Sequence, residues 1–347
     1  MVYPNAIVKE QDPGHEPRLV TFTVFAYNQE NLIREAVESA FAQTYEPLEI
    51  VLSDDCSADR TFEIMCEMAA GYEGPHTVRV VQNPKNFGVL EHAMVRGKEA
   101  CGDIFVGAAG DDVSEPERTT EIVDAFGSKP GVGCVYSAVS VIDGNGIVLD
   151  MHKRFELLTD GIIPRAPRAT NFHVPGCSAA YRKWVLDPPI SDGFKGYAED
   201  LVFSLYLALE GAEIVNLDLP LVKYRAHADA LTHVINVDLA ESETISRRVA
   251  EYRIEWFDEC EKMASALGKS DRLDKCELDR ARAFAQDLVD WPDLTFTQRL
   301  RRATTADYRG DWKPNLKMAA WRTVRLWGRY PSYQPKRILS YFQRKFR

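Results

Sequence analysis

The sequence lacks the features that mark secreted, membrane-spanning and zinc-binding proteins. Its seven cysteines are an odd number and include no Cys-x-x-Cys pair, so neither a disulfide framework nor a zinc site is predicted. No apolar run approaches the roughly 20 residues of a membrane span, and the amino-terminal residues contain no apolar core of the signal-peptide kind. We therefore expect a cytoplasmic protein, which is compatible with a peripheral position on the inner face of the membrane.

The charge balance argues against nucleic acid as a partner of the whole chain. The 347 residues include 42 Lys and Arg against 52 Asp and Glu, a net charge of −10. The charge is uneven, because residues 298–347 hold 14 Lys and Arg against 2 Asp and Glu and are rich in Trp and Tyr. This basic, aromatic segment has two interpretations: it contacts an anionic membrane, or it packs on the acidic remainder of the chain.

Apolar strands alternate with amphipathic helices in the first third of the chain. Short runs rich in β-branched and aromatic residues predict strands at 19–25, 48–52, 78–81 and 104–108. Apolar residues at helical spacing lie between and after them, around 32–41, 62–69, 89–97 and 116–126. This alternation predicts an α/β fold with a mostly parallel, Rossmann-like sheet flanked by helices, and with right-handed crossovers.

The regular alternation of predicted strands and helices ends after residue 130. The pattern predicts a hairpin of 132–142 with 147–149, a basic mobile loop at 152–172, a return to the sheet at 174–181, and a helix to Leu209 after Glu199 and Asp200. Short strands are expected at 214–215 and 221–224, and two charged helices around 241–267 and 271–291.

The stretch Gly107-Ala108-Ala109-Gly110-Asp111-Asp112 follows the fourth predicted strand. Ligands of α/β sheets bind at the carboxyl ends of strands. Two adjacent carboxylates at such an end provide hard oxygen ligands for Mg²⁺ or Mn²⁺ and leave positions for substrate phosphates. The alternative is that one Asp only caps the helix that begins near Pro116.

Five blocks in this order resemble the inverting family 2 glycosyltransferases, which have the nucleotide-sugar-binding GT-A fold. The blocks cover about two thirds of the chain, and each lies at a predicted strand end or loop. They are Val24-Phe25-Ala26-Tyr27-Asn28-Gln29-Glu30 with Gln43-Thr44; Glu49 to Thr61, which contains Ser53-Asp54-Asp55; Asn86-Phe87-Gly88 with Gly102-Asp103; Gly110-Asp111-Asp112; and Glu199-Asp200 with Arg225-Ala226-His227. One position departs from the family pattern, because Ala109 stands where the family commonly has an acid.

The resemblance implies transfer of a sugar from a nucleotide-sugar donor, with UDP as the expected nucleotide, to a glycan or lipid-linked glycan acceptor in cell-surface polysaccharide synthesis. It implies Mn²⁺ or Mg²⁺ as cofactor, with Asp111, Asp112 and His227 as ligands. Residues expected at the nucleotide are Ala26, Tyr27, Glu30, Asp54, Lys85, Asp111 and Arg225. For several of these a structural role is the alternative: core packing for Tyr27, loop shape for Lys85, and a surface ion pair for Arg225. Helix capping before Thr61 is the structural alternative for Asp55 and Asp59, and we accept it for Asp59.

Asp200 is the expected general base for the acceptor hydroxyl, with Glu199 beside it. Like-charge crowding would raise the pKa of Asp200 and improve it as a base; the alternative is that both acids only complement a helix amino terminus. We divide the chain into a lead-in of residues 1–18, a GT-A nucleotide-sugar-binding and catalytic domain of residues 19–239, and a helical, basic extension of residues 240–347. Two rival functions are transfer to a polyprenyl phosphate and non-catalytic binding of a nucleotide sugar or glycan, which Ala109 favours.

Overall fold

The computed structural model describes residues 18–127, 129–155, 174–194, 198–227, 243–290, 293–295 and 297–298. These residues belong to two compact units, which we describe separately. The first unit contains residues 18–155, 174–188 and 198–227, and the second contains residues 189–194 and those from 243 onward.

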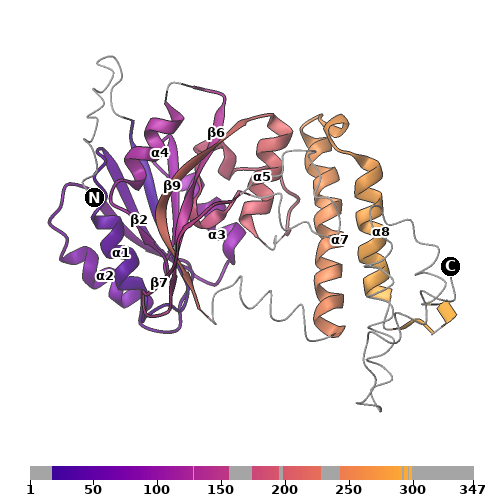
Figure 1. Cartoon of the computed structure of the whole chain (residues 1–347), viewed down its shortest axis with the longest axis horizontal. Coiled ribbons are helices and arrows are strands. Elements are labelled where there is room, and N and C mark those ends of the chain that lie inside the picture. Colours follow the sequence, from indigo (N-terminus) through magenta and orange to yellow (C-terminus); the bar gives the residue numbers. More distant parts are fainter. Residues whose placement is uncertain are drawn as a thin grey trace, which may run out of the picture. The chain divides into compact units, whose positions relative to one another are not determined.

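A nine-stranded sheet forms the centre of the first unit within the described residues (Figure 1). Its order is β3-β2-β1-β4-β8-β6-β9-β5, with β7 paired to β6 outside this path. The strands are β1 (Val20–Ala26), β2 (Leu48–Asp54), β3 (Thr77–Gln82), β4 (Ile104–Ala109), β5 (Val113–Ser114), β6 (Val132–Asp143), β7 (Val148–Lys153), β8 (Ala180–Arg182) and β9 (Glu213–Ala226). The first four strands run parallel to one another, as predicted.

Helices lie between the strands at the positions that the apolar periodicity predicts. They are α1 (Ile33–Phe41), α2 (Thr61–Ala70), α3 (Val89–Glu99), α4 (Arg118–Phe126) and α5 (Glu199–Glu210), with short 3₁₀ turns η2 (Gly176–Ser178) and η3 (Lys183–Leu186). The chain steps outward from β1 to β3 and then crosses back to β4, so right-handed crossovers place α1 and α2 on one face and α3 on the other. The packing agrees, because α1 contacts α2 and α3 contacts α5.

The core of the first unit lies on both faces of β1. Val20, Phe22 and Val24 are fully buried, and so are the alternating Thr21 and Thr23. Successive residues of a strand point to opposite faces, so a strand buried throughout must be covered on both sides. This explains why the first strand is a continuous apolar and β-branched run.

Two features of the sheet differ from the prediction. Beyond β4 the sheet is mixed, because β8 runs antiparallel to both β4 and β6. The two short strands predicted at 214–215 and 221–224 are one strand, β9, which contains an irregularity: Ser137 pairs with Leu217, and the next residue, Ala138, pairs with Pro220. Such a bulge tolerates a proline, which has no N–H to donate, and lets the strand continue.

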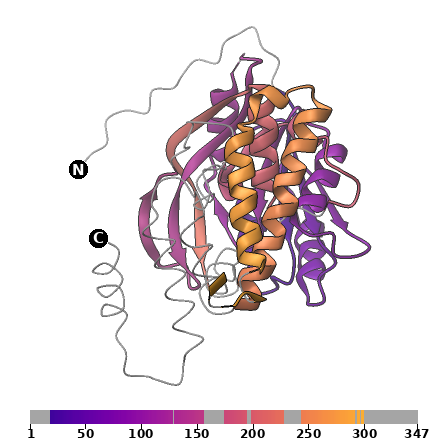
Figure 2. The same ribbon diagram turned by 90° about the vertical axis from the view of Figure 1, so that its right-hand side faces the viewer.

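The second unit is a helical hairpin of α7 (Glu243–Ala266) and α8 (Lys275–Asp290), joined through a short turn, η4 (Ser270–Arg272). Figures 1 and 2 show the two helices side by side. Their shared apolar stripe is buried: Ala250, Phe257, Cys260, Met263 and Ala264 on α7 with Leu278, Ala281 and Ala285 on α8. Arg282 of α8 pairs with Asp258 and Glu261 of α7. Both predicted helices are confirmed within a few residues.

All seven cysteines are free in the structure. Among the described helices, none combines the length and apolarity that crossing a membrane requires. The lead-in to residue 17, residues 156–172 of the basic loop, and residues 299–347 of the basic aromatic segment lie outside the described residues.

Candidate functional site

The carboxyl ends of the parallel strands lie level at one edge of the sheet. The register pairs Ala26 of β1 with Asp54 of β2, and Asp54 with Gln82 of β3. On the other side of β1, Phe25 pairs with Ala109 at the end of β4. Residues that follow β1, β2, β3 and β4 therefore begin at a common edge, which is where α/β sheets bind ligands.

The loops after β1 and β2 are fastened to each other by reciprocal hydrogen bonds. The Asn28 N–H donates to Ser57 Oγ at 2.8 Å, and the Ala58 N–H donates to Asn28 Oδ1 at 2.8 Å. The Glu30 N–H donates to Asp59, and the Glu30 carboxylate accepts from the Arg60 N–H. Glu30, predicted at the nucleotide, thus lies at the same edge and helps to shape it.

Asp59 acts as the helix cap that the sequence predicts. Its carboxylate accepts the Thr61 N–H at 2.9 Å at the start of α2. Burial by itself would raise the pKa of Asp59, but hydrogen bonds from Thr61 and Glu30 lower it below the ordinary value. Tyr27, in contrast, is 47% exposed, so the structure does not use it for core packing.

The side chains of Asp54 and Asp55 are both buried and bonded to the protein. Asp54 accepts from the N–H and hydroxyl of Ser57 and, at 3.0 Å, from Gln82 Nε2. The carboxylate predicted to read the nucleotide base therefore closes the turn that follows β2. Asp55, for which helix capping was the structural alternative, accepts instead from the loop that begins at Asn83. The structure gives each residue a structural partner that sequence spacing did not indicate.

Gly110 allows the loop after β4 to approach β1 closely. Its N–H donates to the Phe25 carbonyl at 2.8 Å. A Cβ at this position would lie 2.5 Å from Gln29 Oε1 and 3.0 Å from both Ala26 Cβ and the Phe25 carbonyl oxygen. Glycine is therefore the residue that fits directly before Asp111, and this close approach fixes where the two Asp residues leave the sheet.

The structure brings Asp111 and His227 together. Asp111 Oδ2 lies 2.9 Å from His227 Nε2, and the two side chains are 16% and 17% exposed. They are 116 residues apart in sequence. A carboxylate and an imidazole in contact at an accessible edge form a donor pair that Mn²⁺ or Mg²⁺ can use, since such ions are often held by one or two carboxylates plus phosphates and water.

Asp112, the next residue in sequence, is engaged within the fold. Its side chain is buried, and one oxygen accepts the Arg225 N–H at 2.8 Å. Burial and the neighbouring Asp111 carboxylate raise the pKa of Asp112 well above its ordinary value. No group of three His, Cys, Asp or Glu side chains within the described part of the chain is placed to hold a metal ion. The predicted three-ligand set is thus reduced to Asp111 and His227.

Arg225, predicted to pair with phosphate, is 1% exposed and engaged within the fold. Its Nε donates to the Asp111 carbonyl at 2.9 Å, and its Nη2 pairs with Glu35 of α1 at 2.8 Å. The guanidinium therefore ties β9 to α1 and to the loop that carries Asp111. Its role in the structure is to position that loop.

Arg118 is a second buried arginine below the same loop, and the sequence reasoning missed it. Its Nη1 donates to Ser114 Oγ at 2.9 Å and its Nη2 to the Gly107 carbonyl at 2.7 Å. Burial lowers the pKa of Arg118 to about 10, while the Cys177 and Asp112 charges oppose this. A sequence signal existed, because Arg118 stands on the helical stripe of Ile122 and Phe126.

Asp200 and Glu199 form the first turn of α5. Gly176 lies close to both side chains: a Cβ at this position would lie 2.5 Å from Glu199 Oε1 and 3.5 Å from Asp200 Cβ. Burial raises the pKa of Asp200 to about 6, although backbone N–H groups of Leu201, Gly176 and Asp200 itself lower it. Burial is the largest cause of this raised pKa, whereas we expected the charge of Glu199 to be. A carboxyl group that titrates near 6 is suited to accept a proton close to neutral pH.

Lys85 lies in the loop between β3 and α3, at the same edge of the sheet. Its Nζ is 5.5 Å from the centroid of the Phe87 ring, which is within the range of a cation–π contact. The side chain is exposed, so its position is compatible with contact to a ligand and with the shaping of its own loop.

About half of the chain is similar to known glycosyltransferases. Residues 21–187 match the family model described as Glycosyl transferase family 2. An uncharacterised protein of Mycobacterium tuberculosis is 29% identical over 220 residues, which cover 61% of this chain and 60% of that protein. A chondroitin synthase of Escherichia coli is 33% identical over 129 residues, 37% of this chain and 18% of the synthase. The chain thus spans about three fifths or less of the length of these relatives.

A solved structure extends the likeness to nearly the whole chain. It is the mannosyltransferase PcManGT from Pyrobaculum calidifontis in complex with GDP-Man and Mn²⁺, at a TM-score of 0.51 and 17% sequence identity. The match covers 96% of this chain and 85% of that chain. At this identity the likeness concerns the fold alone, and it confirms the predicted GT-A-like sheet with a helical C-terminal region.

Proposed function

We propose that this chain, whose residues 21–187 match glycosyltransferase family 2, transfers a sugar from a nucleotide-sugar donor to an acceptor hydroxyl with inversion at the anomeric carbon. The observation that carries the proposal is the combination of an Asp111–His227 pair at the edge of a parallel sheet with a carboxyl group, Asp200, whose pKa is raised to about 6. A divalent ion held by the Asp111–His227 pair would suit a diphosphate, and the Asp200 carboxyl group suits a hydroxyl.

Three tasks of an inverting transfer can be assigned to residues at this edge. The diphosphate leaving group needs positive charge, which a divalent ion would supply when bound at Asp111 and His227. The nucleotide needs a shaped pocket, for which the fastened loops with Ala26, Tyr27 and Glu30 and the loop with Lys85 are the candidates. The acceptor oxygen needs a base, for which Asp200 is the candidate.

Asp200 would act by accepting the proton of the acceptor hydroxyl as the oxygen attacks. An alcohol is a poor nucleophile unless its proton leaves in the transition state, and a positioned base contributes roughly 10²–10⁴ in rate. The backbone N–H groups of Gly176 and Leu201 hold the carboxylate in place. We propose that Glu199, its neighbour in the first turn, supports this geometry.

We infer UDP as the nucleotide, and a glycan or lipid-linked glycan as the acceptor, in the synthesis of a cell-surface polysaccharide. The family match supports sugar transfer, whereas the nucleotide and acceptor rest on the resemblance of the sequence blocks. The raised pKa of Asp200 favours a hydroxyl over a polyprenyl phosphate, because a phosphate acceptor is already ionised and has little need of a base.

The proposal is tested by measuring donor binding and transfer separately. Calorimetry with UDP, GDP and their sugars, with and without Mn²⁺, should give nucleotide binding that depends on the metal ion. Transfer to a panel of glycan and lipid acceptors should give a product of inverted anomeric configuration. A retained configuration would overturn the inverting mechanism, and donor binding without transfer to any acceptor would favour a binding protein.

A further inference from the structure

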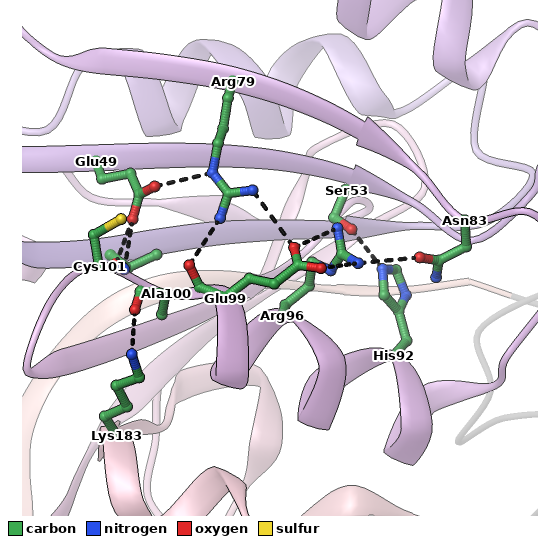
Figure 3. Close-up of polar contacts among 11 residues, drawn as sticks. Glu49, Ser53, Arg79, Asn83, His92, Arg96, Glu99, Ala100, Cys101 and Lys183 are labelled. Carbon is green, nitrogen blue, oxygen red and sulfur yellow. Dashed lines mark hydrogen bonds and ion pairs between the residues drawn. The ribbon is translucent and has the colours of Figure 1, made fainter.

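A group of buried polar side chains lies beside the loop of residues 83–88, on the side of the sheet that α3 covers. Its members are Ser53, Asp55, Asn83, His92 and Arg96, each no more than 4% exposed. Figure 3 shows two hydrogen bonds of this group, one between His92 and Ser53 and one from Arg96 to Asn83. Side chains this polar are rarely buried without a partner, so their common burial indicates a built arrangement.

The Asp55 carboxylate in this group accepts hydrogen bonds from both ends of the loop. At the start of the loop, Asn83 Nδ2 donates to Asp55 Oδ1 at 2.7 Å. At its end, the N–H groups of Phe87 and Gly88 donate to Oδ1 and Oδ2 of Asp55, both at 2.9 Å. Gly88 has a φ of +78°, a conformation that glycine adopts most readily.

Helix α3 contributes His92 and Arg96, which are one helical turn apart and bond to the neighbours of Asp55 in this group, Ser53 and Asn83. His92 Nε2 lies 2.6 Å from Ser53 Oγ, and its Nδ1 lies 4.0 Å from Asp55 Oδ1. The ring meets Phe25 edge-on, with centroids 4.9 Å apart. Arg96 Nη2 donates to Asn83 Oδ1 at 3.4 Å, and Arg96 also pairs with Glu99.

The enclosure gives these contacts their strength. Hydrogen bonds shielded from water are electrostatically stronger, and a partner left unsatisfied there is costly. Loss of the His92 bond would leave the Ser53 hydroxyl without this partner and would loosen the wall beside Asp55. The position of the loop, including Lys85, therefore depends on side chains of α3 that do not belong to the edge of the sheet.

We propose that His92 and Arg96 are positioning residues for the nucleotide-sugar donor: through Ser53, Asp55 and Asn83 they hold the 83–88 loop in the shape that receives it. This inference rests on the proposed function, because the loop carries Lys85, a candidate contact of the nucleotide. Neither residue touches the donor.

The test compares two replacements of His92. His92→Phe keeps a ring against Phe25 but loses the bond to Ser53. His92→Gln keeps an amide nitrogen near the position of Nε2 and should restore the bond. Burial lowers the pKa of His92 to about 4 against the raising effect of Asp55, so the ring is neutral at pH 7 and a neutral amide is a fair replacement. Glu91→Gln, on the adjacent exposed position of α3, is the matched control.

Two readouts separate the position of the loop from chemistry. Hydrogen exchange at the Phe87 and Gly88 amides should be faster in His92→Phe and near the parent rate in His92→Gln and Glu91→Gln. The donor KM and the Kd of UDP should rise about three- to tenfold in His92→Phe, the effect of roughly one lost hydrogen bond, with kcat within about twofold. If His92→Phe does not fold, Ser53→Ala removes the other partner of the same bond and should give the same pattern.

Unchanged amide exchange in a folded His92→Phe would show that this group of buried side chains does not hold the loop. That result would overturn the inference. Faster exchange with unchanged KM and Kd would overturn its link to the donor while leaving the proposed function intact. A fall in kcat alone would also contradict a positioning role. If the parent protein binds no nucleotide, the proposed function fails, and the donor part of the inference fails with it.

Discussion

Replacing Asp200 by Asn should remove activity and, at neutral pH, stabilise the fold. Burial raises the pKa of Asp200 from its ordinary 3.8 to about 6. A difference of about two pKa units corresponds to roughly 3 kcal/mol. Because the residue retains some solvent access, we expect a stability gain of about 1–3 kcal/mol for Asp200→Asn at pH 7.

The sign follows from proton linkage. At pH 7 Asp200 is ionised in both the folded and the unfolded chain, and the fold bears the cost of the buried charge. Below pH 3.8 the carboxyl group is protonated in both states, so this cost disappears. The free energy of unfolding of Asp200→Asn should therefore exceed that of the parent at pH 7, and the difference should shrink as pH falls from about 6 to 3.8.

Catalysis should change in the opposite direction. Asparagine keeps the shape but cannot accept the proton, so kcat should fall by roughly 10²–10⁴ with the Kd of the nucleotide nearly unchanged. In the parent, kcat/KM should fall as pH drops below about 6, the pKa of Asp200. Glu199→Gln is the control in the same helical turn: it should affect both quantities less.

Urea unfolding at pH 7.5 and pH 4, followed by tryptophan fluorescence, measures the stability difference, and sugar transfer to an identified acceptor measures the rate. A parent-like rate in Asp200→Asn would show that the base is elsewhere or that the acceptor is a phosphate. A variant less stable than the parent at pH 7.5 would refute the reasoning from burial, whatever its rate.

Three other changes probe the metal pair, the packing and the basic segment. Asp111→Ala should abolish the Mn²⁺ dependence of nucleotide binding in calorimetry, and full activity in EDTA would contradict a metal role. Asp112→Ala should mainly lower the melting temperature, because it leaves a buried backbone N–H without its acceptor. Gly102→Ala should cost about 3 kcal/mol or more in urea unfolding, since a Cβ would lie 2.6 Å from two backbone atoms, while Gly131→Ala, with open space around it, should be nearly neutral. Deleting residues 298–347 should release the protein from anionic liposomes in a sedimentation assay without loss of nucleotide binding; a full-length protein that ignores such liposomes would argue for packing within the fold.

The local pattern of the sequence predicted most helices and strands to within a few residues. This worked where burial has a regular period, as in β1 and α1, because apolar residues then recur at the spacing of the element itself. It also predicted that Asp54 and Asp111 would follow strands at a common edge. Parallel strands joined by helices all present their carboxyl ends on the same side, so the direction of each strand was sufficient.

The pattern was insufficient where the partner of a strand determines its extent. Strand β9 reads as two pieces because polar residues and Pro220 interrupt its apolar run. It is continuous because β6 pairs with it on both sides of the irregularity. The sequence likewise did not determine the direction of the antiparallel strand β8. Its three residues are too few to show a pattern that indicates the strand's direction or its neighbours.

Tertiary structure alone decided which polar side chains are available for chemistry. Arg225 pairs with Glu35, 190 residues away, and Asp112 accepts from the backbone of the same distant segment, so both are removed from the exposed edge. Asp111 meets His227 there instead. Sequence spacing carries the chemical type of a residue, but burial and hydrogen bonding between distant segments determine whether its charge faces solvent. Burial is likewise the largest cause of the raised pKa of Asp200, which the sequence attributed to the adjacent Glu199.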